Sequence, residues 1–369
     1  MSNTIKKLGG SIGLKILHIW SKITSNIGVR EFQNLSFKTH PEYRYPVDPQ
    51  VEKTYKKLWK VIRSDFNLDT LRLCCNISGN VSPYYVPGQV FASDIQISLC
   101  GWQEEIMYIS NKSYYNRWYQ NNVFPQSHLH NIDGDLYNSK YELISGEQVK
   151  EILENLQYPV VIKPNIGAMG GANVYFPKDQ KELELRMNRS KNYVIQELIH
   201  QHEFFSKYNR FGLNTIRVFL YRSIINNEMH YLNATLRMGK GGGLDNITAG
   251  GIYCSIHPDG HLNSYAVGRH GEKYKEHPDT KLTFSDDRKI PMFGEMKKLA
   301  ISIGRDMYFA RVIGLDMCLD EKNRWRVIEI NLNDMALNLT QYGGEPFFGQ
   351  YTEEIIDYCK NNPWWKKPI

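Results

Sequence analysis

Apolar and polar residues follow different periodicities in different parts of the chain. Between Ser11 and Ile27, apolar residues recur on one face at about 100° per residue, while lysines and serines fall elsewhere. This spacing predicts an amphipathic helix, and its apolar stripe consists of Ile12, Ile16, Ile19, Trp20, Ile23 and Ile27. Such a stripe either packs against the rest of the protein, which is the more common arrangement and the one we expect, or lies on a membrane surface.

The region between 46 and 118 predicts a packing helix, short strands and a second helix. Apolar residues at helical spacing over 55–66 follow a proline-rich connection. Over 71–109, glycines and prolines break the apolar runs into segments of strand length, so we expect short strands there. A polar and aromatic segment over 112–118 predicts a helix.

A β-branched run near the middle of the chain ends in a lysine. Residues 158–176 predict a strand, a loop of small residues and another strand. The backbone N–H groups of the loop, which contains Gly167, Gly170 and Gly171, can approach phosphate oxygens, and Lys163 supplies a positive charge beside them. The residue order is not that of a P-loop. A tight glycine hairpin explains the same pattern.

Two strands joined by a polar turn are predicted over 312–320 and 324–331. Glu329 and Asn331 are two residues apart and therefore point to one face, and Asp316 can pair opposite them. Two carboxylates and an amide oxygen are hard ligands of the kind that Mg²⁺ prefers. The alternative is a polar, exposed hairpin face. We favour the metal site, because carboxylates among apolar neighbours are costly unless a metal or a partner compensates their charge.

The charge distribution separates the N-terminal arm from the rest of the chain. The whole chain has 45 Lys and Arg against 39 Asp and Glu, a net charge of +6. Residues 1–60 contain 11 Lys and Arg against 4 Asp and Glu, so the arm carries +7 and the remainder −1. A nucleic-acid-binding domain carries its cations over the folded body, so nucleic acid is not an expected partner.

The composition, 41% hydrophobic and 23% charged, is that of a globular protein long enough for two or three packed units. Six cysteines without a C-x-x-C pair favour free thiols in a reducing compartment. We find no secretion signal, and no uninterrupted apolar run of about 18 residues that would span a membrane. We therefore expect a cytoplasmic protein, with peripheral contact at the inner face of the membrane through residues 11–27 as an open alternative.

The order of these elements resembles the ATP-grasp superfamily over about residues 105–340. The resemblance rests on Lys112, Lys163 with its glycine-rich loop, Gln196 to Ile199 with Glu203, and the spacing of Asp316, Glu329 and Asn331. Segments 211–218, 236–246 and 250–252 resemble the sugar-transfer-associated branch. This implies an α+β protein in which two α+β sub-domains clasp ATP, preceded by an α/β pre-domain and the basic amphipathic helix.

The resemblance also implies a division of the chain. The basic arm would occupy 1–45 and the pre-ATP-grasp domain 46–110. The small sub-domain with the phosphate-binding loop would occupy 111–200, and the C-terminal sub-domain with the metal site 201–369.

Roles for individual residues follow from the resemblance. The phosphates of ATP would be bound by Lys112, Lys163, Gly167, Gly170 and Gly171. Adenine and ribose would be bound by Gln196, Glu197, Leu198, Ile199 and Glu203. Two Mg²⁺ ions would be held by Asp316, Glu329 and Asn331, with Glu329 bridging both ions and Asn331 completing the second. The implied cofactors are ATP and these two Mg²⁺ ions.

Two arginines and a polar pair are candidates for the chemistry itself. Arg217 and Arg237 lie on successive predicted strands, and a guanidinium suits the γ-phosphate or a substrate carboxylate; surface ion pairing is the alternative. Asp245 and Asn246 follow a glycine-rich stretch and either orient an attacking amine or sugar hydroxyl or form a plain turn.

One departure from the family pattern concerns Gly314, two residues before Asp316, where peptide-forming relatives often carry an arginine. Arg311 is near but out of phase, so we expect Arg217 or Arg237 to take that role. A separate motif, the H-x-H pair at 200–202, has no third ligand and predicts hinge-loop histidines rather than a metal site.

The resemblance implies an Mg-ATP-dependent ligase that joins a carboxylate to an amine or a hydroxyl through an acyl phosphate. Its substrate would be a small molecule or a sugar-linked compound, such as a cell-surface polysaccharide or its precursor. Two alternatives stay open: a small-molecule or sugar kinase, and a non-catalytic nucleotide-binding scaffold in polysaccharide assembly.

Overall fold

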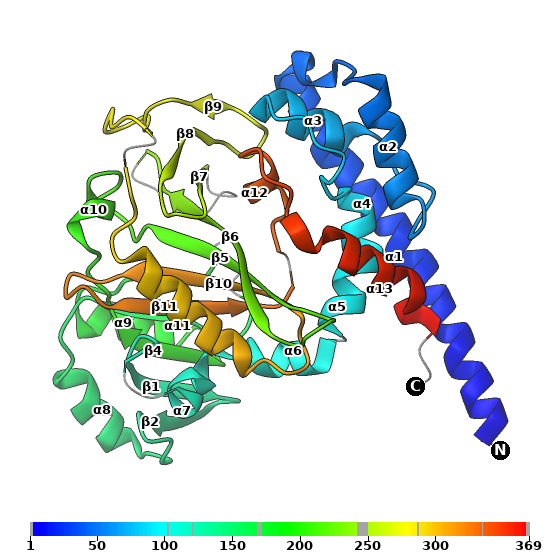
Figure 1. Ribbon diagram of the computed structural model, residues 1–369. Coiled ribbons are helices and arrows are strands. Elements are labelled where there is room, and N and C mark those ends of the chain that lie inside the picture. The colour runs from blue at the N-terminus through cyan, green and yellow to red at the C-terminus, as the bar shows by residue number, and fades with distance from the viewer. Residues whose placement is uncertain are drawn as a thin grey trace.

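Two antiparallel sheets and an N-terminal group of helices form the described part of the chain (Figure 1). The computed structural model describes residues 3–101, 103–119, 122–167, 172–241, 250–285, 288–333 and 335–366. The mixture of helices and antiparallel strands confirms the predicted α+β class. The sub-domain boundaries expected at 45, 110 and 200 stay a prediction.

The N-terminal region consists of helices and their connections, with no strand among its described residues. Its helices are α1 (Asn3–Thr39), α2 (Pro49–Trp59), α3 (Asp69–Ser78), α4 (Gly88–Val90), the π-helix η2 (Phe91–Ile95), α5 (Gln96–Cys100) and α6 (Gln103–Ile109), with the short 3-10 helix η1 (Pro41–Arg44) after α1. The expectation of short strands over 71–109, and with it an α/β pre-domain, is wrong. Six of the ten residues of α3 are buried, and a short apolar run does not distinguish a buried helix from a strand.

The small sheet has the strand order β2-β1-β4-β3. Its strands are β1 (Ser127–Ile132), β2 (Asp135–Asn138), β3 (Val160–Pro164) and β4 (Tyr193–Glu197). Helices α8 (Gly146–Glu154) and α9 (Gln180–Met187) cover the face that carries Val160 and Ile162. Because side chains alternate along a strand, Lys163 lies on the opposite face.

The large sheet has the strand order β11-β10-β5-β6-β7-β8-β9. Its strands are β5 (Thr215–Arg222), β6 (Met229–Met238), β7 (Ile252–Ile256), β8 (Leu262–Val267), β9 (Lys273–Tyr274), β10 (Val312–Leu319) and β11 (Trp325–Asn331). Helix α11 (Phe293–Arg305) lies on one face, where a Cβ added at Gly304 would stand 2.7 Å from Cδ1 of Leu220. The alternate residues of β5, Arg217 among them, therefore point to the other face.

The remaining short helices precede the small sheet, connect the two sheets or follow the large sheet in the sequence. They are η3 (Lys112–Tyr114), α7 (Tyr115–Trp118), α10 (Glu203–Ser206), α12 (Asn338–Gln341), η6 (Gly349–Tyr351), α13 (Thr352–Asn361) and η7 (Trp364–Lys366). The helical conformation of η3 and α7 confirms the helix predicted over 112–118.

One large core joins the N-terminal helices, the large sheet and the C-terminal helices, and a separate core lies under the small sheet. Polar contacts connect the parts of the large core. The Tyr43 hydroxyl donates to the Gly271 carbonyl at 3.0 Å, and the Trp364 indole donates to the Ser93 carbonyl at 2.8 Å. The N-terminal helices, the large sheet and the C-terminal helices therefore form one packed unit, which we call the large unit.

The predicted amphipathic helix exists and extends further than expected, over Asn3–Thr39, but its apolar stripe faces solvent. The stripe side chains are between 53% and 64% exposed. The expectation that the stripe packs against the protein is wrong, because polar contacts hold the opposite face of the helix to the body. Among the described residues, no helix has the length and apolar character needed to cross a membrane.

Candidate functional site

The register of the large sheet brings the predicted metal and arginine residues together. Asp316 on β10 pairs with Glu329 on β11 and with Arg217 on β5, so three predicted site residues lie side by side across three strands. Asn331 is two residues beyond Glu329 on β11 and pairs with Gly314. The predicted hairpin and its pairing are confirmed.

Both predicted arginines bind Asp316. Arg217 contacts Oδ1 through its Nε and donates from Nη2 to Oδ2 at 3.2 Å, and Arg237 Nη2 lies 3.1 Å from the same Oδ2. Arg237 also donates to the Thr215 hydroxyl. Burial opposes ionisation of Asp316, but the two guanidiniums hold its pKa below the ordinary aspartate value. The arginines are thus buried partners of a carboxylate, and the alternative of surface ion pairing is wrong.

Lys112, which lies in η3 just before the small sheet in the sequence, contacts the same face. Its Nζ lies 2.8 Å from Oε1 of Glu329, although Lys112 itself is almost completely buried. The backbone N–H of Lys112 donates to the carbonyl of Asn165, the residue after β3, and the Tyr115 hydroxyl accepts from the N–H of Ile330 on β11. These contacts fix Lys112 between the residue that follows β3 and the strand β11, where the two sheets meet.

Lys163 lies on the face of β3 that is opposite α8 and α9, and it is only 7% exposed. Burial and the neighbouring charge of Lys112 lower the pKa of Lys163 to about 8, while Glu329 acts in the opposite direction. Two lysines thus stand close enough to repel each other in a buried place.

The junction carries more positive than negative charge. We call the six side chains Lys112, Lys163, Arg217, Arg237, Asp316 and Glu329 the junction cluster. Four cations face two carboxylates in it. An excess of buried positive charge is unfavourable by itself and suits a multiply charged anion.

The same contacts change the argument for a metal. The charges of Asp316 and Glu329 are compensated by arginine and lysine, so burial of these carboxylates does not by itself require a cation. Among the described residues there is also no group of three or more His, Cys, Asp and Glu that could hold a metal. The donor set is two carboxylates plus Asn331, whose buried Nδ2 has no hydrogen-bond partner. This set fits Mg²⁺ with phosphate oxygens as additional ligands.

The predicted adenine-binding segment begins at the C-terminal end of β4, where side-chain contacts hold it in place. The buried Gln196 donates to the Pro125 carbonyl and the Ser127 hydroxyl. Glu197 is ion-paired with the buried Arg326 of β11 at 2.5 Å, so its side chain connects the two sheets. Leu198 and Ile199 are half-buried after the strand.

Glu203, the predicted ribose-binding residue, begins α10 with an exposed side chain that lies 3.5 Å from Lys207. The ring of His202 accepts a hydrogen bond from the N–H of Phe204 and caps that helix. His202 is therefore a hinge-loop residue, as the sequence predicted.

Some predicted site residues lie outside the described residues: Gly170, Gly171, Asp245 and Asn246. Gly167 is described and has a positive φ of 80°, a conformation that favours glycine.

The arginine expected by analogy before Asp316 is absent, and Arg311 does not replace it. The guanidinium of Arg311 donates to the carbonyls of Arg222 and Ser223, and its N–H donates to the carbonyl of Leu99. A Cβ added at Gly314 would lie 3.5 Å from Cδ of Arg217, so Arg217 stands directly beside this position. The expectation that Arg217 or Arg237 takes the role stays a prediction.

Sequence reasoning missed the residues that position the cluster. Asn165 accepts from the Ser113 hydroxyl and donates to the Asn131 carbonyl, and Arg326 joins Asp320 to Glu197. The asparagine directly after Lys163-Pro164 was a usable signal, because an amide that follows a buried strand commonly fixes a turn.

The family model described as sugar-transfer associated ATP-grasp matches residues 183–354, slightly less than half of the chain. The match confirms the resemblance that the sequence suggested. Comparison with curated proteins gives no match.

Solved structures of ATP-grasp enzymes are similar at low identity. A biotin carboxylase from Campylobacter jejuni in a β-γ-ATP complex has 16% identity and a TM-score of 0.40, with 68% of this chain and 46% of that chain covered. An L-amino acid ligase from Bacillus licheniformis has 14% identity and a TM-score of 0.40, with 67% and 48% covered. An N5-carboxyaminoimidazole synthetase from Staphylococcus aureus complexed with ADP has 11% identity and a TM-score of 0.39, with 66% and 52% covered. The chain thus spans about half the length of these structures.

Proposed function

We propose that this protein is an Mg-ATP-dependent ligase that joins a carboxylate to an amine or a hydroxyl through an acyl phosphate. The family match, with its association to sugar transfer, supports a substrate that belongs to a cell-surface polysaccharide or its precursor. The observation that carries the proposal is the junction cluster, in which four cations surround two carboxylates between two sheets.

The cluster residues divide into two groups by the phosphate oxygens they would meet. Lys112 and Lys163 lie on the small-sheet side and would bind the α and β phosphates. Arg217 and Arg237 lie on the large-sheet side and would stabilise the transferred γ-phosphoryl group. Phosphoryl transfer depends mainly on positioning and charge neutralisation, so a preorganised cationic site contributes directly to the rate.

The metal would be held by Glu329, Asp316 and Asn331. Lys112 contacts Oε1 of Glu329, which leaves the other oxygen for a cation, whereas both oxygens of Asp316 already contact guanidiniums. Bound Mg²⁺ supplies charge neutralisation between the phosphates. Arg217 and Arg237 keep Asp316 ionised and fixed, so this carboxylate needs no proton loss before it binds a cation.

A kinase is the second candidate, because the position two residues before Asp316 holds Gly314 rather than the arginine often seen in peptide-forming relatives. A nucleotide-binding scaffold is the third. The junction cluster suits such a scaffold as well, because a triphosphate ligand would balance the buried positive charge there too, so ADP formation is what distinguishes the scaffold from the ligase.

Trapping with hydroxylamine tests the reaction class. The full chain is incubated with Mg-ATP, hydroxylamine and a panel of carboxylates that includes amino acids and sugar acids, and both ADP and hydroxamate are measured. The ligase produces both, because hydroxylamine captures an acyl phosphate. Glu329→Ala and Lys163→Met lose both products, and the exposed control Lys207→Gln keeps them.

The other outcomes distinguish the alternatives. ADP together with an acid-stable phosphate ester, and no hydroxamate, indicates a kinase. Binding of Mg-ATP without ADP formation in the presence of any tested carboxylate or sugar favours the scaffold.

A further inference from the structure

The outer face of α1 carries a continuous apolar stripe in solvent. We keep the name outer stripe for Ile12, Ile16, Ile19, Trp20, Ile23 and Ile27. Trp20 is 64% exposed and Ile16 61%, although each is a residue type that normally loses most of its surface on folding. The stripe spans roughly 22 Å along the helix at about 1.5 Å per residue. A contiguous exposed apolar face of this kind marks an interaction site.

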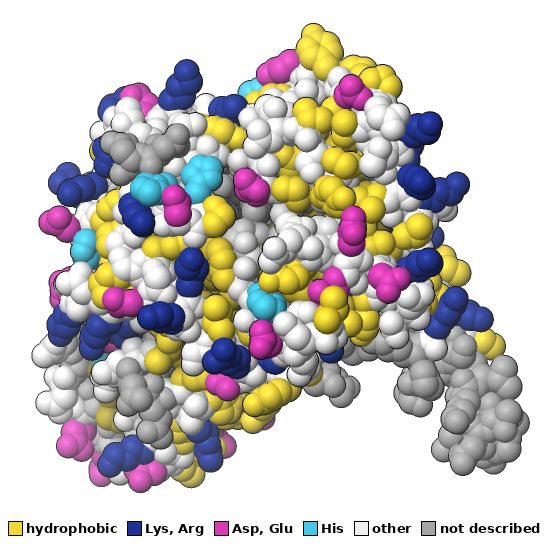
Figure 2. Space-filling model, viewed as in Figure 1, with side chains coloured by type: hydrophobic (Ala, Val, Ile, Leu, Met, Phe, Trp, Pro, Cys, Tyr) yellow, Lys and Arg dark blue, Asp and Glu magenta, His cyan; other side chains and the backbone are white. Residues whose placement is uncertain are grey.

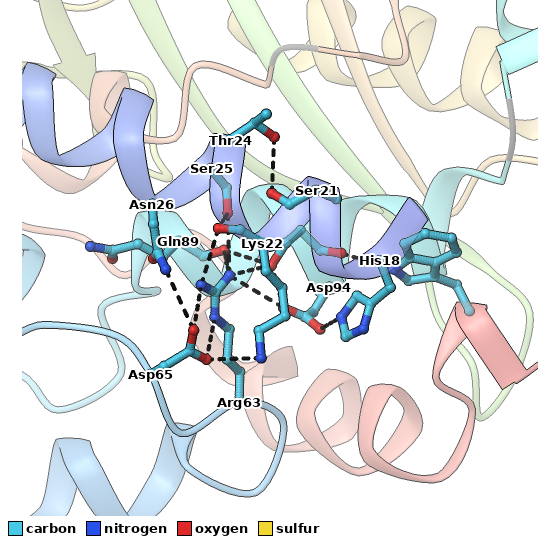
Figure 3. A network of polar contacts seen from close by, with 12 residues as sticks. His18, Ser21, Lys22, Thr24, Ser25, Asn26, Arg63, Asp65, Gln89 and Asp94 are labelled. Atoms are coloured by element: carbon cyan, nitrogen blue, oxygen red, sulfur yellow. Dashed lines mark hydrogen bonds and ion pairs between the residues drawn. The ribbon is translucent and has the colours of Figure 1, made fainter. Parts of the chain in front are cut away.

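The inner face of α1 is fixed by polar contacts, so the stripe cannot turn inward. Figure 3 shows Arg63 and Asp94 reaching up to the helix from the body. His18 Nε2 lies 2.9 Å from Oδ1 of Asp94, and Arg63 donates to the Lys22 carbonyl at 3.4 Å and to the Ser25 hydroxyl at 3.2 Å. At about 100° per residue, His18 and Ser25 point away from the centre of the outer stripe, on the opposite side of the helix.

Further along α1 the same face stays docked. Gln33 is buried and donates to the Thr70 hydroxyl at 2.9 Å, and Trp365 of the C-terminal segment stacks on His18 with ring centroids 3.5 Å apart. The helix is therefore held at several points along its length. Leu14 and Phe37 are buried on the docked face, but the apolar side chains of the outer stripe face outward, which is the reverse of an ordinary docked helix.

The charge of α1 indicates which partner covers the stripe. The helix contains six Lys and Arg and one acidic residue, Glu31. Lys15, Arg30 and Lys38 are exposed, while Lys22 is paired with Asp65 at 3.0 Å. In Figure 2, Lys and Arg side chains follow the edge of the molecule where Figure 1 draws α1 and α2, with hydrophobic side chains between them. A second copy of this helix would bring like charges together, whereas an anionic surface attracts them.

We propose that the outer stripe of α1 lies on the surface of an anionic lipid bilayer, with its apolar side chains in the boundary between headgroups and acyl chains and its cations against the headgroups. An amphipathic helix that lies in the plane of the interface gains from apolar burial and from attraction to anionic lipid together. Because the inner face is bonded to the body, binding through α1 holds the whole large unit at the membrane.

Vesicle flotation with the full chain tests the proposal. Vesicles of phosphatidylcholine alone are compared with vesicles that also contain phosphatidylglycerol. The protein floats with the anionic vesicles. The double variant Ile16→Glu/Ile23→Glu reduces partitioning about a hundredfold or more, because two apolar anchors become charged. Lys15→Gln/Arg30→Gln reduces it roughly fivefold for each cation removed.

Ile225→Glu is the matched control, since Ile225 is 82% exposed and lies in the turn after β5, away from α1. It leaves partitioning unchanged. Thermal unfolding is measured for each variant, and an unchanged midpoint shows that lost binding is not lost folding. Equal binding to both kinds of vesicle contradicts the role of charge. Absence of vesicle binding, with a dimer in sedimentation velocity that Ile16→Glu/Ile23→Glu dissociates, overturns the proposal in favour of a second copy.

Discussion

Two polar clusters in this protein use similar side chains and differ in their burial and in their charge balance. The cluster that docks α1 contains His18, Lys22, Arg63, Asp65 and Asp94, so that two permanent cations face two carboxylates (Figure 3). The junction cluster contains four cations and two carboxylates. In the docking cluster, the numbers of permanent cations and of carboxylates are equal. In the second, burial and then repulsion by Lys112 lower the pKa of Lys163.

Charge balance distinguishes a structural network from a binding site. A cluster that only holds a helix in place gains from a close match of donors, acceptors and charge. A cluster that binds a polyanion is arranged for the complex, so the free protein bears the cost of unbalanced charge. The following predictions test whether the two clusters differ in this way.

Removal of the charge on Asp316 has the largest expected effect. Asp316→Asn leaves two buried guanidiniums without their counter-charge and lowers the free energy of unfolding by about 3–5 kcal/mol in urea titrations. Asp94→Asn in the docking cluster costs less, about 1–3 kcal/mol, because its neighbour His18 can be neutral and Arg63 retains Asp65. Equal costs at the two sites would remove the distinction between the clusters.

Replacement of Lys163 separates stability from binding. Lys163→Met removes a charge whose pKa is lowered from 10.5 to about 8 by burial and by Lys112. The free protein therefore becomes more stable by about 2–3 kcal/mol at pH 7, measured by urea unfolding. Nucleotide affinity, measured by titration calorimetry, falls at the same time. A loss of stability would show that Lys163 is a structural residue.

The pH dependence of nucleotide binding follows from the same group. A lysine whose folded pKa is lowered keeps its proton below pH 8 and loses it as the pH rises further, so affinity for ATP decreases by about fivefold between pH 8 and pH 9. Lys163→Arg keeps its charge over this range, so its profile is flat if the charge of residue 163 causes the decrease. A decrease in the arginine variant as steep as in the wild type would assign the titration to another group.

Glu203 gives the smallest expected effect. It is exposed and paired only with Lys207, so Glu203→Gln changes the free energy of unfolding by less than about 0.5 kcal/mol. If Glu203 accepts from the ribose, nucleotide affinity falls about fivefold, which corresponds to one lost hydrogen bond of about 1 kcal/mol. Lys207→Gln is the matched control with unchanged affinity.

The sequence predicted the chemistry of the site better than the surroundings that hold it. Alternation along 312–331 placed Asp316 opposite Glu329, because strand periodicity is local and a hairpin needs only a turn. The pairing of both arginines with Asp316 depends on the order of four strands, and the contact of Lys112 with Glu329 depends on how two sheets meet. A local sequence pattern predicts neither the arginine pairing nor the Lys112 contact.

In the N-terminal region, the local sequence pattern predicted the wrong secondary structure over 71–109 and the wrong direction of the stripe of α1. Short apolar runs over 71–109 suggested strands, but tertiary burial made them helices. The stripe of α1 was recognised from its spacing. Its direction was not, because helical periodicity shows that a face is apolar and does not show what covers it.

The thermal shift of the full chain with Mg-ATP tests the central claim most directly, namely that the junction cluster is an Mg-ATP site. Wild-type protein is compared in Mg-ATP, in ATP with EDTA and without nucleotide, beside Glu329→Ala and Lys163→Met. We predict a rise of the unfolding midpoint with Mg-ATP only, equivalent to about 2.7 kcal/mol at a hundredfold excess over Kd, and no rise in either variant. No shift of the wild type under any condition, or equal shifts in wild type and variants, would contradict the account.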